Sequence, residues 1–289
     1  MLGLTEIEKA AYAKDGFVAG VQAFSADETS AIRAEIEALE AQHSAGASGR
    51  SLNHYFRVNG QLVIPLLAKL ARTPAILEKV ADVLGPNLLV WSVELFIKEP
   101  HTQSVVSWHQ DITYWGMGET DEEVTAWVAL SDVSVEAGCM RFIPGSHKNS
   151  IVDHADTFDE DNLLSRGQEI AGVDEAKSVH GPLKPGEMSF HHGRCFHASG
   201  PNQSNDRRIG LAIRYVTPEV RQADTGPDYA IPVRGVDMHQ GWIPVAGASS
   251  LFHPDDLALY DQVLKHQSTT LAGNADGDVA LYETAGGSA

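Results

Sequence analysis

The stretch LLVWSVELFIKEP, residues 88–100, changes the character of the chain. Apolar and β-branched residues dominate it and a proline ends it, which is typical of a β-strand. Regular spacing of such strands predicts a sandwich or a small barrel. Four more runs of this kind follow, separated by Gly, Pro, Asn and Asp: VTAWVALSDV (124–133), GCMRFIPGS (138–146), GEMSFHHG (186–193) and RRIGLAIRYVTP (207–218).

The residues before this region, 1–87, are predicted to be mainly helical. Ser25 followed by Glu28 is a capping-box pattern, and apolar residues recur after it at helical spacing to about Gln42. A second helix is expected from Pro74 to about Leu84, where a Gly-Pro pair stops it.

The length of 289 residues suits one domain with a substantial core. We expect a β core at 88–218 and a C-terminal extension at 219–289, whose last part, 273–289, reads as a weakly ordered tail. Residues 149–180 form a long polar connection, which we interpret as a lid over the mouth of the barrel.

Acidic residues outnumber basic ones by 39 to 21, giving a formal net charge of -18. A surface of this sign repels nucleic acid and anionic membranes, so the expected partner is a small molecule, with a homo-oligomer left open. We find neither a secretory signal nor an apolar segment long enough to span a bilayer. Two cysteines, Cys139 and Cys195, suit a reducing compartment, so a cytoplasmic location is predicted.

The segment WHQDITYW (108–115) places His109 and Asp111 two positions apart. In an extended strand or at its exit, both side chains share one face and can coordinate one metal ion. Such a pair arises easily by chance, and a third ligand must come from another segment. HHGRCFHASGPN (191–202) offers three histidines. Two histidines and one carboxylate on a face of an octahedron leave three positions open, as non-haem iron oxygenases require.

The order of these motifs resembles the phytanoyl-CoA dioxygenase family of 2-oxoglutarate oxygenases. The likeness covers roughly 88–218: H-x-D, a Trp-bearing strand, GC-x-x-x-IPGSH, HASGPN and RR-x-G-L-A-I-R-Y. It implies a mainly β fold with flanking helices, built on a double-stranded β-helix (jelly roll, cupin-like) with iron near its open end. It also implies that His109, Asp111 and His197 hold the Fe(II), with 2-oxoglutarate and O2 as cosubstrates.

The resemblance further implies that Arg208 binds the distal carboxylate of 2-oxoglutarate. A guanidinium suits a two-pronged contact with a carboxylate, and strand alternation puts Arg208, Gly210, Ala212 and Arg214 on one face. Gly210 and Ala212 then leave room for a ligand. Arg207 points to the opposite face as a surface charge, unless the strand slips by one residue and the two arginines exchange roles.

Two more positions match cosubstrate contacts of the family, and strand alternation places a third beside them. Ser199 matches such a contact directly, although it also fits a simple turn hydroxyl. Trp127 matches a tryptophan beside the cosubstrate, and core packing is an equal and compatible reading. Thr125 shares its face and is predicted to help bind 2-oxoglutarate.

The remaining candidates near the metal are given lesser roles. His147 follows the turn in the family's PGSH segment and is expected to shape the barrel without binding metal. His191 and His192 are expected to contact the metal ligands at most, and not the metal itself. Cys195 could approach the metal, but a small buried apolar role is favoured. Because Asp111 fills the position that a small residue takes in halogenating relatives, the resemblance favours hydroxylation, with 2-oxoglutarate converted to succinate.

Charged and polar groups suggest a small polar or zwitterionic substrate. Glu94 and Lys98 share a face of an apolar strand, Asn53, His54 and Arg57 lie in a segment expected to cover the barrel mouth, and Arg141 and Arg214 add positive charge. The alternative is that Glu94 and Lys98 pair with each other, or that the arginines are solvated.

The whole chain is similar to the branch of the family that hydroxylates aminoalkylphosphonates such as 2-(trimethylammonio)ethylphosphonate at the carbon next to phosphorus. Arginines with Asn or His would then hold the phosphonate, while Glu94, Tyr114 or Trp115 would face the cationic end. Two alternatives remain: hydroxylation of a natural-product or amino-acid-like scaffold, and a non-catalytic cupin-like binding protein. A zinc hydrolase would lack a general base.

Overall fold

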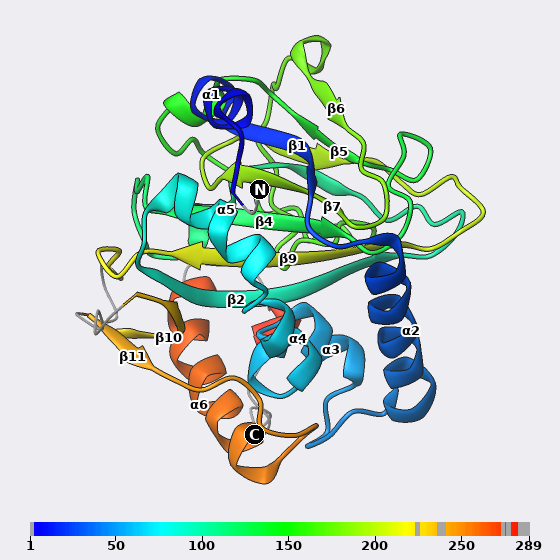
Figure 1. The fold of residues 1–289 in the computed structure, drawn as a ribbon, viewed down its shortest axis with the longest axis vertical. Helices are drawn as coiled ribbons and strands as arrows, with labels where there is room; N and C mark the ends of the chain where they lie inside the picture. The colour runs from blue at the N-terminus through cyan, green and yellow to red at the C-terminus, as the bar shows by residue number, and fades with distance from the viewer. Residues whose placement is uncertain (1–2, 223–225, 236–240, 273–274, 276–278, 283–289) are drawn as a thin grey trace.

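The computed structural model describes residues 3–222, 226–235, 241–272, 275 and 279–282 (Figure 1). Eleven strands in the described residues form two sheets. The larger sheet runs in the order β1 (Phe17–Gln22), β7 (Glu187–His192), β4 (Glu123–Ala129), β9 (Arg208–Val216), β2 (Leu88–Lys98), β10 (Asp228–Arg234) and β11 (Trp242–Pro244). The smaller sheet runs β3 (Val106–His109), β8 (His197–Ser199), β5 (Met140–Phe142) and β6 (Val179–Gly181).

Neighbouring strands pair in antiparallel fashion, apart from the parallel pair β10 and β11. Side chains from both sheets line one shared cavity, so the sheets face each other as in a jelly roll. The predicted fold class is therefore confirmed, and each of the five β-rich runs contains a strand.

The helices cover the outer face of the larger sheet (Figure 1). They are α1 (Glu6–Asp15), α2 (Ala26–His43), α3 (Leu52–Arg57), α4 (Pro65–Leu70), α5 (Pro74–Leu84) and α6 (Pro254–Leu271). The predicted capping box is present at α2, where the Ser25 hydroxyl accepts from the Glu28 amide at 3.3 Å and the Glu28 carboxylate accepts from the Ser25 amide at 2.8 Å. Among the described residues, none of these helices is long and apolar enough to cross a membrane.

Strand β9 shows how the larger sheet separates core from cavity. Ile209, Leu211 and Ile213 are fully buried in the apolar cluster shared with the helices. The intervening residues face the smaller sheet, and both Arg208 and Arg214 line the cavity between the sheets. Alternation along the strand therefore places the arginines as the sequence predicts.

The connection at 149–180 contains few regular elements, the turn η4 (Glu175–Lys177) and the start of β6. It is fastened to the C-terminal helix α6 by Arg166, whose Nε donates to the carbonyl of Leu271 at 2.9 Å. Leu163, Leu164 and Gln168 of this connection line cavities between the sheets, as expected of a cover over the barrel mouth. Most of the predicted tail, 273–289, lies outside the described residues, although η5 (Ala280–Tyr282) is described.

Gly210 does not leave room for a ligand, contrary to the expectation from sequence. A Cβ built at this position would lie 1.7 Å from Cζ2 of Trp127, on the neighbouring strand β4. The indole of Trp127 therefore fills the space that the missing side chain leaves. Gly210 sets the position of the tryptophan, and Ala212 is the small residue that borders the cavity.

We predict that Gly210→Ala lowers the free energy of unfolding by about 1–3 kcal/mol, because the added methyl group overpacks the Trp127 contact. Urea denaturation measures this change. Gly200→Ala is the control, since a Cβ there meets nothing within 4 Å. Equal stability of the two variants would contradict the assigned packing.

Candidate metal centre and its two cavities

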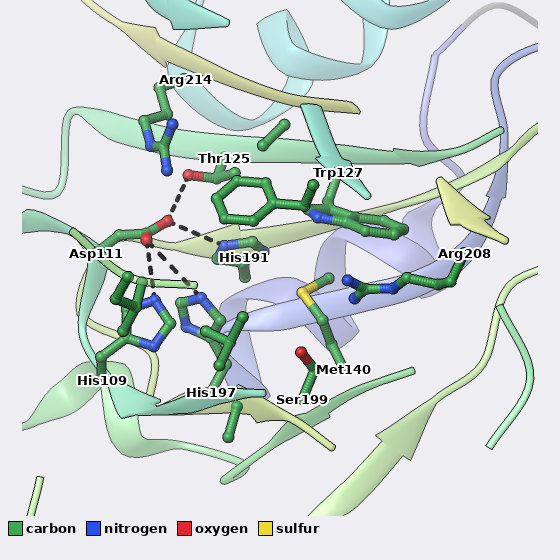
Figure 2. Close-up of a pocket in the computed structure, with 15 residues that line it drawn as sticks. His109, Asp111, Thr125, Trp127, Met140, His191, His197, Ser199, Arg208 and Arg214 are labelled. Atoms are coloured by element: carbon green, nitrogen blue, oxygen red, sulfur yellow. Dashed lines mark hydrogen bonds and ion pairs between the residues drawn. The ribbon is translucent and has the colours of Figure 1, made fainter. Parts of the chain in front are cut away.

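Three side chains converge where the smaller sheet meets the larger one. The ligand atoms of His109, Asp111 and His197 all lie within 4.8 Å of one another, and all three residues are buried. His109 ends β3, Asp111 begins the turn η2 (Asp111–Tyr114), and His197 begins β8. Figure 2 shows both imidazoles turned toward the Asp111 carboxylate, with Nε2 to Oδ1 distances of 3.3 Å for His109 and 3.8 Å for His197.

Both imidazoles are prepared to bind a metal through Nε2. Nδ1 of His109 lies 2.9 Å from the carbonyl oxygen of Ser107, and Nδ1 of His197 lies 2.9 Å from that of Cys195. A carbonyl oxygen only accepts, so each Nδ1 carries the hydrogen and each Nε2 keeps its lone pair. Burial also lowers the pKa of His197 well below its usual value, which favours the neutral form that ligates metals.

The two oxygens of Asp111 have different neighbours. Oδ2 accepts a hydrogen bond from the Thr125 hydroxyl at 2.8 Å and lies 3.1 Å from Nε2 of His191 (Figure 2). Oδ1 is the oxygen nearest the two ligand histidines. Thr125 thus orients the metal-facing carboxylate, its expected part in binding 2-oxoglutarate stays a prediction, and His191 takes the surrounding role expected of it.

Glu123 is a neighbour that the sequence reasoning missed. Its carboxyl is fully buried, and Oε1 lies 3.2 Å from the hydroxyl oxygen of Thr125. Burial raises the pKa of Glu123 well above its usual range, and the charge of Asp111 adds to this shift. Burial therefore favours the neutral form of Glu123, while, despite burial, hydrogen bonds with His109 and His191 hold the pKa of Asp111 well below its usual value.

A first cavity of about 420 Å³ extends from the triad along the inner face of the larger sheet. Arg208 lies at its far end, opposite Asp111 (Figure 2). Arg208 is 1% exposed, its Nε and Nη1 have no hydrogen-bond partner among the described residues, and Cζ lies 4.6 Å from the centre of the Trp127 ring. Burial lowers the pKa of Arg208 to about 10, so the group is charged at neutral pH.

A buried guanidinium without an acidic partner is costly unless a ligand neutralises it. A dicarboxylate that chelates a metal at the triad and reaches Arg208 with its other carboxylate fits this arrangement. Ser199 and Trp127 line the same cavity, as the sequence predicts, and the residues present therefore fit both iron and 2-oxoglutarate. Arg207 points outward to Glu40 and Glu99, at 2.7 and 2.8 Å, so the strand has not slipped.

A second cavity of about 440 Å³ reaches the triad from the side of α3 and the 149–180 connection. It shares His109, Asp111 and Arg214 with the first. Its other polar lining comes from Arg57, Glu94, Ser165, Gln168 and Tyr282. Two chambers thus meet at the candidate metal position.

The second cavity contains one ion pair, between Arg214 and Glu94, and one further arginine, Arg57. Nη1 of Arg214 lies 2.8 Å from Oε1 of Glu94. The pKa of Arg214 is raised, since Glu94 and Asp111 outweigh its burial. Arg57 donates from Nη2 to the carbonyl of Leu163, and burial lowers its pKa. Its buried Nε has no partner in the part of the chain that the structure describes.

Other predicted substrate residues lie away from both cavities. Asn53 is exposed, and His54 packs its ring against Tyr55 and Tyr260. Arg141 donates to Glu175 at 2.6 Å on the outside of the smaller sheet, with its guanidinium over Trp108. We therefore correct these three assignments.

Lys98, Tyr114 and Trp115 also differ from expectation. Lys98 bonds to Ser199 and not to Glu94, so the proposed pair between them is wrong. Arg166 covers the Tyr114 ring at 4.3 Å, and Arg214 lies over the Trp115 ring at 4.9 Å. These aromatic faces are already occupied by cations of the protein itself.

His147, His192 and Cys195 pack or bond to residues outside the triad. Nε2 of His192 lies 3.0 Å from Oδ1 of Asp121, and the His147 ring packs beside it. Cys195 is fully buried and accepts a weak hydrogen bond from Ser146 at 3.7 Å.

Comparison with known proteins agrees with this geometry. The non-heme monooxygenase ThoJ, in its apo structure, is 34% identical with a TM-score of 0.81, covering 92% of this chain and 97% of that one. The epimerase SnoN, in complex with Fe3+, alpha ketoglutarate and nogalamycin RO, is 26% identical with a TM-score of 0.63, covering 84% of this chain and 95% of that one. The fold and the cavities define an Fe(II)/2-oxoglutarate-dependent oxygenase acting on a small molecule.

The sequence profile described as Phytanoyl-CoA dioxygenase (PhyH) matches residues 12–210, and the chain belongs to this family. A curated relative, the probable alpha-ketoglutarate-dependent hypophosphite dioxygenase of Stutzerimonas stutzeri, is 28% identical over 220 residues, or 71% of this chain and 76% of the relative. The family excludes the non-catalytic alternative considered from sequence. The match begins at Tyr12, so the resemblance extends further into the helical region than the motifs alone indicated.

We predict that Thr125→Val weakens metal binding by about 10–100-fold, because partners that orient metal ligands commonly contribute this much. Calorimetric titration of the protein with Fe(II) under anaerobic conditions measures the affinity. Thr29→Val is the control, since Thr29 is also buried and donates to Ser25 far from the triad, at 2.7 Å. Unchanged iron affinity in Thr125→Val would contradict the orienting role.

Proposed function

We propose that His109, Asp111 and His197 bind Fe(II), that Arg208 anchors 2-oxoglutarate, and that the enzyme hydroxylates a small zwitterion held in the second cavity. The best candidate is an aminoalkylphosphonate such as 2-(trimethylammonio)ethylphosphonate, at the carbon next to phosphorus. One observation carries this proposal: two chambers meet at the triad, one ending in an unpartnered guanidinium and the other lined by charges of both signs.

When bound, iron(II), 2-oxoglutarate and O2 supply the oxidation that inserts one oxygen atom into a substrate C–H bond and forms succinate and CO2. The protein positions the reactants and limits water. Arg208 and Ser199 fix the far end of the cosubstrate, while Leu164 and Phe96 border both chambers as apolar walls. Asp111 occupies the third ligand position, which supports hydroxylation over halogenation.

The charge balance of the second cavity supports an anionic substrate group. Apart from the metal ligands, Arg57 and Arg214 carry two positive charges against the one negative charge of Glu94. The excess cation is Arg57, whose unpartnered Nε offers a donor to a phosphonate oxygen. A quaternary or primary ammonium group of the substrate would approach Glu94. The rings of Tyr114 and Trp115 are already covered by Arg166 and Arg214.

The hypophosphite dioxygenase relative is named for a phosphorus oxyanion, which is compatible with this proposal. The nogalamycin in the SnoN structure favours the alternative, a natural-product scaffold. The charged lining of the second cavity favours the aminoalkylphosphonate over the natural-product scaffold. A cytoplasmic location stays a prediction from the sequence.

We predict that Arg208→Met raises KM for 2-oxoglutarate about 100-fold or more, because truncating one partner of a buried charge pair costs about 2–5 kcal/mol. Succinate release as a function of 2-oxoglutarate concentration measures this effect. Arg207→Met removes the adjacent arginine from the outer face and should leave KM within about twofold, since surface ion pairs contribute little. Equal effects of the two substitutions would refute the assignment.

A substrate panel tests the second cavity. We expect 2-aminoethylphosphonate or its trimethylammonium analogue to stimulate succinate release and to yield a hydroxylated product detected by mass spectrometry. Arg57→Met should raise KM for the phosphonate at least about tenfold through loss of a charge-assisted contact, while KM for 2-oxoglutarate changes little. Coupled turnover of an uncharged natural-product scaffold, with none for any phosphonate, would favour the alternative.

A further inference from the structure

Lys98 is a buried basic residue beside the first cavity. It is the last residue of β2, pairs in register with Arg208 on β9, and is 1% exposed. Lys98 is not part of the cavity lining, but its ammonium reaches the adjacent strand β8 and the residue that follows it. Its partner Ser199 lines the cavity together with Arg208 (Figure 2).

The contacts of Lys98 match an ammonium group with three hydrogens. Nζ lies 2.8 Å from Oγ of Ser199, 2.7 Å from the carbonyl oxygen of Gly200 and 3.4 Å from the carbonyl oxygen of Ser199. All three partners are uncharged oxygens, so these contacts leave the positive charge of Lys98 without a neutralising carboxylate. Lys98 and Arg208 are thus two buried basic groups on adjacent strands.

The bond to Lys98 restricts how the Ser199 hydroxyl can point. In its ammonium form Lys98 has donors but no lone pair, so Oγ of Ser199 then accepts from it. The hydroxyl hydrogen is then available to another acceptor, and Ser199 lines the cavity that Arg208 also lines. A carboxylate oxygen beside Arg208 is the acceptor that this geometry favours.

We propose that Lys98 is a positioning residue for the cosubstrate, which directs the Ser199 hydroxyl toward the distal carboxylate of 2-oxoglutarate and adds a second positive charge behind Arg208. This inference rests on the proposed assignment of the first cavity to 2-oxoglutarate. It replaces the role in substrate binding that the sequence suggested for Lys98.

Lys98 is also expected to take up a proton when 2-oxoglutarate binds. Burial lowers the pKa of Lys98 to about 6, and the charge of Arg208 adds to this effect. Further along the inner face, Glu94 lies four residues away on β2, roughly 13 Å at strand spacing, and is paired with Arg214. Glu99 points outward to Arg207, and Cys139 lies near Arg208 in its thiol form, because burial raises its pKa.

A bound dianion raises the pKa of Lys98, so the ammonium form is favoured in the complex. Near neutral pH, 2-oxoglutarate binding should therefore take up as much as about one proton. The affinity is greatest below the pKa of the free protein. It falls as pH rises from that value toward the higher pKa of the complex.

Calorimetric titration of the anaerobic Fe(II) protein with 2-oxoglutarate at pH 6–8 tests the proton uptake. Repeating it in buffers of different ionisation enthalpy gives the number of protons taken up. The carboxylates of 2-oxoglutarate are ionised throughout this range, so they take up no protons. The wild type should show proton uptake. Lys98→Met should lose it and raise Kd about tenfold at pH 6, where loss of one charge-assisted contact is expected to have this effect.

Two further variants separate the contributions. Ser199→Ala should weaken binding but keep the proton uptake, because the charge of Lys98 remains. Lys79→Met is the matched control: Lys79 is also buried, at 7% exposure, but lies on α5 and donates to the carbonyl of Ala75. It should match the wild type in both readouts.

Wild-type binding without proton uptake, or uptake that persists in Lys98→Met, would overturn the proposal. The wild-type measurement decides this even if Lys98→Met does not fold. Failure of the underlying cavity assignment has a different signature, because Arg208→Met would then bind 2-oxoglutarate as tightly as the wild type.

Discussion

The antiparallel pairing of His109 with His197 is the contact on which the rest of the site depends. It joins β3 to β8 in the smaller sheet and brings two distant segments of the chain to one point. Asp111 follows directly at the exit of β3, so its carboxylate faces both imidazoles. The larger sheet then completes the centre from the opposite side, since Thr125 and His191 hold the second oxygen of Asp111.

Buried charge is concentrated around this centre. Arg208, Lys98 and Arg57 are buried or half-buried basic groups, and the contacts described for them include no carboxylate partner. Desolvating such groups destabilises the free protein, and anionic ligands recover part of that cost. These basic groups lie around the site although the whole chain has a formal net charge of -18.

Local patterns in the sequence predicted much of this arrangement. The alternation of β9 placed Arg208 inside and Arg207 outside, the H-x-D spacing placed two candidate ligands together, and the capping box located α2. These features depend on residues close in the chain, so their period or spacing is readable directly. The choice of His197 among three nearby histidines came from the family resemblance, and spacing alone left it open.

Features that depend on pairing between strands could not be read in this way. Glu94 pairs with Arg214 of the neighbouring strand β9, and not with Lys98 of its own strand. The indole of Trp127 occupies the space beside Gly210 for the same reason, because β4 and β9 are neighbours. Arg141 similarly meets Glu175, a residue of the long connection whose path has no regular pattern.

The most direct test of the account is a crystal structure of the protein with Fe(II) and 2-oxoglutarate, grown without oxygen. Anomalous scattering from iron should place one peak within bonding distance of Nε2 of His109 and His197 and of a carboxylate oxygen of Asp111. The distal carboxylate of 2-oxoglutarate should then contact Arg208 and Ser199. An iron peak elsewhere, or a cosubstrate whose distal carboxylate points into the second cavity, would contradict the account.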